Sequence, residues 1–274
     1  MKNFITRALS GIIYAALLFG ALIAGKGWLA ALLVLLSALG VYEYLRMNSD
    51  NMMPRLASVV DIAMSAALQL ASCAYFTQHV EASRILGLLL VALLILRLVS
   101  QLYIVNTDTI ASLQRSLSAI VYVALPLALV PLIYYQLATP YVVLALFIFI
   151  WMNDTGAYCV GCLIGRHKLF ERISPKKTWE GFFGGMIFSV GAAFALRALF
   201  PDYFSQFDYL LLCLMGAVVT IFATLGDLIE SMIKRSVGVK DSGKLIPGHG
   251  GILDRIDSLL LVIPAIVIYL VIIS

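Results

Sequence analysis

Long apolar runs separated by short polar segments dominate this chain. A helix needs ~20 mostly apolar residues to cross a bilayer. Runs of this kind occur nine times, at Ile5–Ala24, Trp28–Met47, Leu56–Phe76, Ile85–Tyr103, Leu117–Leu137, Tyr141–Leu163, Phe182–Phe200, Tyr209–Ile233 and Ile252–Ile273. The connections at 25–27 and 138–140 are so short that they predict tight helical hairpins. The pattern therefore predicts an all-α, polytopic integral membrane protein with about nine transmembrane helices.

The composition excludes three other classes of protein. Of the 274 residues, 62% are apolar and 12% are charged, whereas soluble domains have about 45–50% and ~25%. The apolar excess excludes a soluble domain and a disordered chain. Four cysteines are too few for a disulfide-rich secreted scaffold. A net charge of +4 would suggest nucleic acid in a soluble protein, but in a membrane protein the placement of charge matters more, and no nucleic-acid partner is expected.

The basic residues are distributed unequally between the two sides of the membrane. With nine spans, the N-terminus and the even-numbered connections share one side, and 15 of the 19 Lys and Arg residues fall there. Basic loops stay in the cytoplasm, so we expect a cytoplasmic N-terminus and an external Ser274. Lys2 and Arg7 before the first run also fit a signal peptide, but that run is long enough to span.

Five carboxylates lie inside predicted spans or at their edges, where each is costly and therefore a functional hypothesis by default. They are Glu43, Asp61, Asp154, Asp227 and Glu230. Glu43 is close to the cytoplasmic end of its span and can pair with Arg46. Asp61 can pair with Arg55 or Arg97. These partners favour structural ion pairs for both acids.

The strongest candidate site lies around Asp227. Glu230 and Ser231 follow it at i+3 and i+4, so the three side chains share one face of a helix. Asp254 and Asp257, three residues apart, share a face at the start of the last span. Two helices thus bring carboxylates to one membrane depth beside basic residues. Such hard oxygen ligands suit Mg²⁺ that carries a phosphate substrate; the alternative is a set of acids held only by ion pairs.

Two other polar groups are weaker signals. Asp154 stands in mid-span beside Asn153 and Thr155, which predicts a wet cavity or a buried polar network. Cys159 and Cys162 have a metal-like spacing, but they lie in an apolar span without a second pair, so zinc is not expected. No phosphate-binding loop of the P-loop or dinucleotide type occurs.

Two cytoplasmic connections, residues 165–181 and 234–257, are longer than the others and dense in polar groups. Their Lys and Arg residues are explained by the role of basic residues that flank spans and set the orientation of the protein in the membrane. This role does not explain why glycine is clustered with acid in the second loop, near Asp254 and Asp257. Backbone N–H groups in such a loop, which also holds His249, can approach an anion closely.

These residues form patterns that resemble a known family. The segment Ser231–Asp257 reads S-x2-K-R-x4-K-D, then P-x-H-G-G-x2-D-R-x-D, and is similar throughout to the signature of the phosphatidate cytidylyltransferase (CDP-diacylglycerol synthase) family. SPKKTWEG at 174–181 and NDTGAY at 153–158 resemble two further motifs of that family. The resemblance covers the C-terminal half, which predicts a catalytic half at 141–274 and about five other spans at 1–140.

The resemblance implies a Mg²⁺-dependent enzyme of the cell membrane that joins CTP and phosphatidate into CDP-diacylglycerol and diphosphate. It also implies a homodimer. With the bias of basic residues, it predicts an active site on the cytoplasmic face. The phosphate of phosphatidate is already anionic, so positioning and charge neutralisation should suffice for catalysis.

The resemblance and the spacing together suggest roles for individual residues. The predicted metal ligands are Asp227, Asp254, Asp257 and Glu230, and four carboxylates leave room for a second cation. The predicted phosphate-binding residues are Lys234, Arg235, Lys240, Arg255, Ser231 and His249. Lys176 and Lys177 would bind either the lipid phosphate or CTP. The residues closest to the chemistry would be Asp227, Asp254, Lys234 and Arg235.

Two rival functions stay open. Another membrane enzyme that uses CTP, a polyprenol kinase or an archaeal-type lipid cytidylyltransferase, would also need a metal and basic residues. A transporter could use Asp61, Asp154 and Asp227 as a relay. The acids cluster at one face, however, and no inverted repeat is visible in the sequence.

Overall fold

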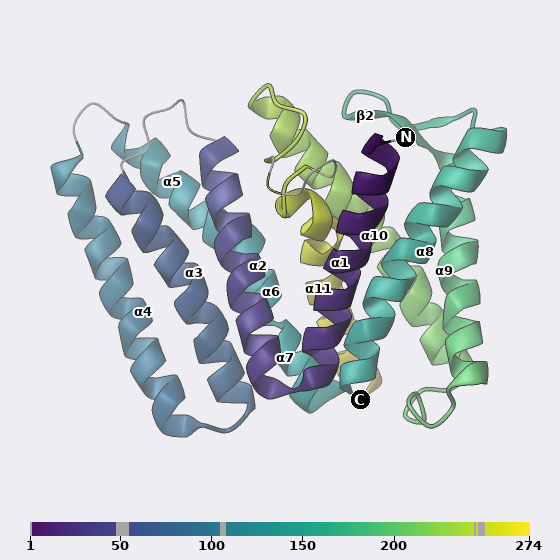
Figure 1. Cartoon of the computed structure of the whole chain (residues 1–274), viewed down its shortest axis with the longest axis horizontal. Helices are drawn as coiled ribbons and strands as arrows, with labels where there is room; N and C mark the ends of the chain where they lie inside the picture. Colours follow the sequence, from purple (N-terminus) through teal and green to yellow (C-terminus); the bar gives the residue numbers. More distant parts are fainter. Residues whose placement is uncertain (1, 48–54, 105–107, 244, 246–249) are drawn as a thin grey trace. The chain divides into compact units, whose positions relative to one another are not determined.

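The structure is a computed structural model that describes residues 2–47, 55–104, 108–243, 245 and 250–274, without the side chains of residues 2–10, 12 and 55 (Figure 1). The α-helices are α1 (Lys2–Ala24), α2 (Lys26–Met47), α3 (Arg55–Phe76), α4 (Val80–Ser100), α5 (Thr109–Ala119), α6 (Leu125–Ala128), α7 (Val130–Leu132), α8 (Pro140–Ile164), α9 (Trp179–Leu199), α10 (Tyr209–Ser236) and α11 (Leu253–Ile273). Helices of other types are the 3₁₀-helix η1 (Gln101–Tyr103) and the π-helices η2 (Ile120–Ala124) and η3 (Ile133–Leu137). Two strands, β1 (Lys168–Phe170) and β2 (Ser174–Thr178), form an antiparallel hairpin.

Eight helical segments in the described part of the chain are long enough and apolar enough to cross a membrane. They are Lys26–Met47, Leu56–Phe76, Val80–Tyr103, Thr109–Leu137, Pro140–Ile164, Trp179–Leu199, Tyr209–Ser236 and Leu253–Ile273. In α1 the apolar stretch is shorter, Ile13–Ala24. Helices satisfy their backbone groups internally, as a bilayer demands. The predicted all-α polytopic architecture is confirmed, while the count of nine spans and the cytoplasmic N-terminus stay predictions.

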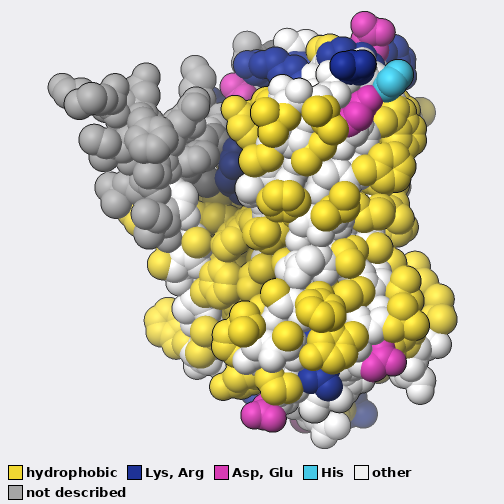
Figure 2. All heavy atoms as spheres, turned by 90° about the vertical axis from the view of Figure 1, so that its right-hand side faces the viewer, with side chains coloured by type: hydrophobic (Ala, Val, Ile, Leu, Met, Phe, Trp, Pro, Cys, Tyr) yellow, Lys and Arg dark blue, Asp and Glu magenta, His cyan; other side chains and the backbone are white. Residues whose placement is uncertain are grey.

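Apolar side chains cover most of the face that carries α8 and α9, whereas charged side chains gather mainly toward its two ends (Figure 2). Leu163, Phe183, Ile187 and Phe194 are among the large apolar residues exposed on these two helices. Leaving so much apolar area in water would be costly. The surface therefore fits contact with lipid chains.

Packing divides the chain into two compact units. The first comprises residues 1–131 and 237–255, and the second comprises residues 132–236 and 256–274. The loop that follows α10 thus belongs with the N-terminal helices, although it is far from them in sequence. This division reflects packing alone, and the functional boundary at residue 140 stays a prediction.

In the first unit α2, α3 and α4 pack side by side (Figure 1), and a buried ion pair joins the last two. Arg97 of α4 is 2% exposed, and its Nε donates to Asp61 Oδ1 of α3 at 3.2 Å. The guanidinium also donates to Ser116 at 2.9 Å, Ser112 at 2.9 Å and Gln101 at 3.1 Å. The predicted pairing of Asp61 with Arg97 is confirmed, and each nitrogen of the buried guanidinium has an acceptor.

The predicted fifth span is the least regular helical segment. Residues 109–137 form one helical stretch built from α5, η2, α6, α7 and η3, and it begins earlier than the apolar pattern predicts. Pro126 and Pro131 lack the N–H that would donate to the preceding turn, and the wider π-helical turns adjust the backbone around them. Gln69 of α3 donates to the carbonyl oxygen of Ala124 at 2.8 Å, which satisfies a backbone group beside the first proline.

In the second unit glycine allows α8 and α9 to pack closely. A Cβ atom at Gly184 would lie 2.5 Å from Val160, and one at Gly185 would meet Asn153 Oδ1. A larger residue at either position would force the helices apart. Because α10 packs against both helices, the polar patch of α8 and the carboxylate Asp227 of α10 line the same pocket.

Candidate active site

Three carboxylates from two helices meet in the second unit. Asp227 and Glu230 lie one turn apart in α10, and Asp257 lies near the start of α11. One carboxylate oxygen from each residue lies within 4.8 Å of the other two. The approach is close because Gly226 has no side chain: a Cβ atom there would lie 2.7 Å from the carbonyl oxygen of Asp257. Helical periodicity and one glycine thus build a cluster of negative charge.

Two lysines neutralise part of this charge. The Nζ atom of Lys177 lies 2.6 Å from Asp227 Oδ2, and that of Lys234 lies 2.5 Å from Glu230 Oε2. Ser231 donates to Asp227 Oδ1 at 3.3 Å. Glu230 and Lys234 are buried, whereas the side chain of Asp227 is 37% exposed. A cation at the protein surface can therefore reach Asp227 directly.

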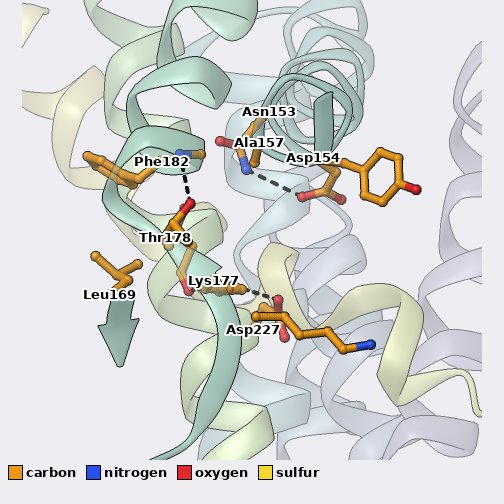
Figure 3. A pocket seen from close by; sticks show the side chains of 12 residues that line it. Asn153, Asp154, Ala157, Leu169, Lys177, Thr178, Phe182 and Asp227 are labelled. Carbon is orange, nitrogen blue, oxygen red and sulfur yellow. Dashed lines mark hydrogen bonds and ion pairs between the residues drawn. The ribbon is translucent and has the colours of Figure 1, made fainter. Parts of the chain in front are cut away.

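The β1–β2 hairpin carries Lys177 to the cluster. Glu180, just after β2, accepts the backbone N–H of Arg166 at 3.1 Å and that of His167 at 3.2 Å. Its Oε1 also lies 2.6 Å from His167 Nδ1. Thr178 caps α9 by accepting a backbone N–H of the first turn at 3.2 Å. Both ends of the hairpin are thereby held, and its lysine reaches Asp227 of α10 (Figure 3).

A pocket of about 240 Å³ lies beside the Lys177–Asp227 pair (Figure 3). Its polar lining comprises Asn153, Asp154, Lys176, Lys177, Thr178, Thr224 and Asp227, and its apolar lining includes Ala157, Tyr158, Leu169 and Phe182. Asn153 donates to Asp154 Oδ1 at 3.3 Å. The polar patch predicted around Asp154 therefore forms part of a cavity wall. Charged groups facing an apolar wall suit a ligand that has both a phosphate group and an apolar part.

Asp254, predicted to share a metal with Asp227, has other contacts in the structure. Its carboxylate accepts the backbone N–H of Ser242 at 3.0 Å and that of Gly251 at 2.8 Å. Both donors are backbone N–H groups of the loop before α11, and such charge-assisted hydrogen bonds compensate the carboxylate. Asp254 belongs to the first unit, and the group of three close carboxylates does not include it. Its role as a metal ligand stays a prediction.

The predicted phosphate-binding residues differ in exposure. The exposed ones are Lys176, Arg235, Lys240 and Arg255. Lys234 is buried against Glu230, so its charge acts within the cluster and not at the surface. His249 lies outside the described residues.

Glu43 of α2 is not one of the site residues predicted from the sequence. Its side chain is 2% exposed, and it accepts hydrogen bonds from Ser242 Oγ at 3.1 Å and from the Leu253 N–H at 2.9 Å. Arg46, the expected partner, donates to the hydroxyl of Tyr42 at 3.3 Å. The partners of Glu43 lie 199 and 210 residues further along the chain. The only signal in the sequence was the cost of an acid in a span.

A comparison with known proteins decides the family. A sequence model described as the cytidylyltransferase family matches residues 5–273. The chain belongs to the cytidylyltransferase family. The predicted family is therefore confirmed, and the match includes the N-terminal helices, which carry none of the three motifs described above.

Curated relatives of this cytidylyltransferase-family chain match it over a shorter stretch. It is 48% identical over 129 residues to phosphatidate cytidylyltransferases of Staphylococcus epidermidis and Staphylococcus haemolyticus. It is 46% identical over 131 residues to that of Staphylococcus aureus. Each match covers 47% of this chain and 48% of the relative. The chain thus spans about half the length of the curated relatives it matches.

Proposed function

We propose that this chain is a phosphatidate cytidylyltransferase, which joins CTP and phosphatidate to give CDP-diacylglycerol and diphosphate. Three carboxylates that meet within 4.8 Å beside Lys177 and Lys234 carry this proposal, because such a set suits a cation and phosphate groups together. The names of the staphylococcal relatives support phosphatidate as the acceptor.

The reaction exchanges one phosphoanhydride bond for another. A phosphate oxygen of phosphatidate attacks the α-phosphorus of CTP, and the bond from that phosphorus to the oxygen bridging to the β-phosphate breaks, which releases diphosphate. The nucleophile is already anionic near neutral pH, so no strong base is required. The obstacle is repulsion between two anions, and the site would act by in-line positioning and neutralisation of charge.

The carboxylates of Asp227, Glu230 and Asp257 fit a Mg²⁺ ion, which prefers hard oxygen ligands. Two oxygens bound to one such ion lie at most about 4.2 Å apart, so oxygens within 4.8 Å of one another need only a small movement of the side chains. Asp254, three residues before Asp257 in α11, would be the fourth ligand of the proposed set, which would leave room for a second cation. When bound, the cation would offset the negative charge of the CTP phosphates.

Basic residues around the cluster would hold the phosphate oxygens. Lys177 would exchange its contact with Asp227 for one with substrate, and Lys176 lines the same pocket. Lys234 would keep the local charge balanced from its buried position beside Glu230. Further phosphate contacts would come from Arg235, Lys240, Arg255, Ser231 and His249. Arginine can grip phosphate with two parallel hydrogen bonds.

We further propose that the protein is a multi-pass protein of the cell membrane, forms a homodimer and has its active site at the cytoplasmic face. The bias of basic residues supports this orientation. Glu171 is exposed in the turn of the β1–β2 hairpin. In a variant without the four natural cysteines, Glu171→Cys should react with an impermeant maleimide only after cells are permeabilised. Labelling of intact cells would contradict the orientation.

The decisive experiment for the function uses purified protein in detergent. CTP, Mg²⁺ and phosphatidate should yield CDP-diacylglycerol and diphosphate in equal amounts, and omission of phosphatidate should abolish diphosphate release. A parallel reaction contains a polyprenol or an archaeal-type ether lipid in place of phosphatidate. Product formed only in that reaction would favour one of the rival CTP-dependent enzymes, and no product with any acceptor would reject the proposed activity.

A further inference from the structure

Glu43 occupies an unusual position for an acid in the N-terminal helices. It lies in α2, a helix long and apolar enough to cross a membrane, and its side chain is 2% exposed. Burying a carboxylate is costly unless hydrogen-bond donors compensate it. The loop between α10 and α11, which packs in the same unit, supplies donors to one of the two carboxylate oxygens, Oε2.

The two donors to Glu43 lie on either side of residues 243–252, within the signature segment Ser231–Asp257. Ser242 Oγ donates to Glu43 Oε2 at 3.1 Å from one side, and the Leu253 N–H donates to the same oxygen at 2.9 Å from the other. Leu253 is the first residue of α11, so its N–H has no acceptor within the helix. The carboxylate thus caps α11 from a different helix, where the helix dipole favours a negative charge.

Two glycines of the loop fit closely around the same carboxylate. A Cβ atom at Gly243 would lie 2.5 Å from Glu43 Oε1, and one at Gly251 would meet Glu43 Oε2. Neither position could hold another residue without displacing the acid. The glycines at these two positions of the loop, which flanking charge does not explain, therefore have a steric reason.

Asp254, in the first turn of α11, reinforces the arrangement. It accepts the backbone N–H groups of Ser242 and Gly251 at 3.0 and 2.8 Å. Two carboxylates, one from α2 and one from α11, thus hold both sides of the loop together. Asp254 is already in the proposed metal set, whereas nothing in the reaction requires Glu43.

We propose that Glu43 is a positioning residue for the reaction: from the N-terminal helices it holds the two sides of the signature loop at the spacing that nucleotide binding requires. This inference rests on the proposed function. It assigns a task to the N-terminal helices beyond anchorage in the membrane. Glu43 contacts a backbone N–H and a hydroxyl of the loop. It therefore fixes the position of the loop and does not contact the substrate.

The first measurement compares Glu43→Gln with Glu81→Gln. Glutamine keeps the size of the acid but places a neutral oxygen or an NH₂ group against the two donors. We expect kcat/KM for CTP to fall roughly tenfold to a hundredfold, with a melting temperature within a few degrees of the natural protein. Glu81 is an exposed acid of α4 in the same unit, paired with Arg84, and its variant should keep the natural kinetics.

The second measurement is amide hydrogen exchange, which does not depend on activity. Peptides covering residues 240–253 should exchange at least tenfold faster in Glu43→Gln than in the natural protein or in Glu81→Gln, while peptides of α3 should be unchanged. Faster exchange in a protein that forms no product would keep the loop-holding role and reject the proposed function. Unchanged exchange would overturn the inference, whatever the kinetics.

A milder variant covers the case in which Glu43→Gln does not fold. Ser242→Ala removes one donor and leaves the carboxylate in place. We expect a fall in kcat/KM for CTP of about threefold to tenfold and faster exchange in the same peptides. If neither changes, Glu43 does not position this loop and the inference is overturned.

Discussion

Two of the acid sites inside the described helices, the one around Asp61 and the one around Asp227, differ in how their charge is balanced. In the N-terminal helices Asp61 faces one arginine, and each nitrogen of Arg97 donates to a group of the same network. In the second unit three close carboxylates are paired with two lysines, and Asp227 is 37% exposed. A balanced, closed network ties helices together. An excess of carboxylate at an accessible place attracts a cation.

The difference shows that the cost of an acid in a membrane helix does not by itself indicate catalysis. Both sites carry that cost. The two sites differ in the ratio of acidic to basic side chains and in whether a cation can reach the acid from the protein surface. Each of the following substitutions tests one side of this contrast.

Asp227→Asn should have the largest effect on turnover. Asparagine keeps the size of the side chain but lacks the charge that a hard cation demands. Loss of such an electrostatic contribution costs roughly 3–4 kcal/mol, or at least about 10²-fold in kcat. The measurement is kcat at saturating Mg²⁺ together with a thermal melt. Near-normal turnover of a folded variant would show that Asp227 is not a site residue, and the Asp61 and Asp227 sites would then not differ in function.

Asp61→Asn should lower stability and leave the chemistry intact. It leaves the buried charge of Arg97 without its counter-charge, and breaking a buried pair in this way costs roughly 3–5 kcal/mol. We expect a lower unfolding midpoint in detergent and a kcat per folded molecule within about twofold of the natural value. The matched control is the double variant Asp61→Leu with Arg97→Met, which should recover much of the stability. A selective loss of kcat would contradict a purely structural pair.

Substitution of the two hairpin lysines should have an intermediate effect. Lys177 lies 2.6 Å from Asp227, whereas Lys176 lines the pocket without a contact to that carboxylate in the described structure. Lys177→Gln should therefore raise the KM for CTP or phosphatidate by about tenfold, and Lys176→Gln by less. Separate titrations of the two substrates would tell which phosphate each lysine holds. Unchanged kinetics in the double variant would mean that both lysines serve only to orient the helices in the membrane.

Glu180→Gln should have the smallest effect. This acid lies outside the cluster and holds the hairpin by accepting N–H groups of Arg166 and His167. Glutamine can accept one of these hydrogen bonds. We therefore expect a rise of only about threefold in the KM for the substrate, CTP or phosphatidate, whose KM Lys177→Gln raises. Steady-state kinetics with both substrates provides the measurement. A loss as large as that of Asp227→Asn would mean that Glu180 belongs to the reacting group.

The positions of the helices could be predicted from the sequence. The predicted span Tyr141–Leu163 corresponds to α8 at Pro140–Ile164, and Phe182–Phe200 corresponds to α9 at Trp179–Leu199. Hydrocarbon admits only segments that satisfy their own backbone, so apolar length is a reliable guide. The predicted loop 165–181 instead contains the β1–β2 hairpin, because short polar strands lack a recognisable periodicity.

Part of the candidate site could also be predicted. Asp227 and Glu230 share a helix face because their spacing requires it. Asp254 and Asp257 are equivalent by the same rule, yet Asp257 contributes an oxygen to the cluster and Asp254 accepts N–H groups of the loop. Periodicity predicts a common face, but it does not predict which member of that face meets the neighbouring helix.

The sequence by itself determined the all-α membrane architecture and the residue types of the site, since both follow from local composition and spacing. Only the tertiary structure decided that Lys177, from the β1–β2 hairpin, pairs with Asp227 of α10. It also decided that Glu43 holds a loop 199 residues away. Such contacts arise when helices pack, and their geometry depends on small residues such as Gly226 and Gly251 that let two segments approach. Local periodicity carries no information about segments so distant in the chain.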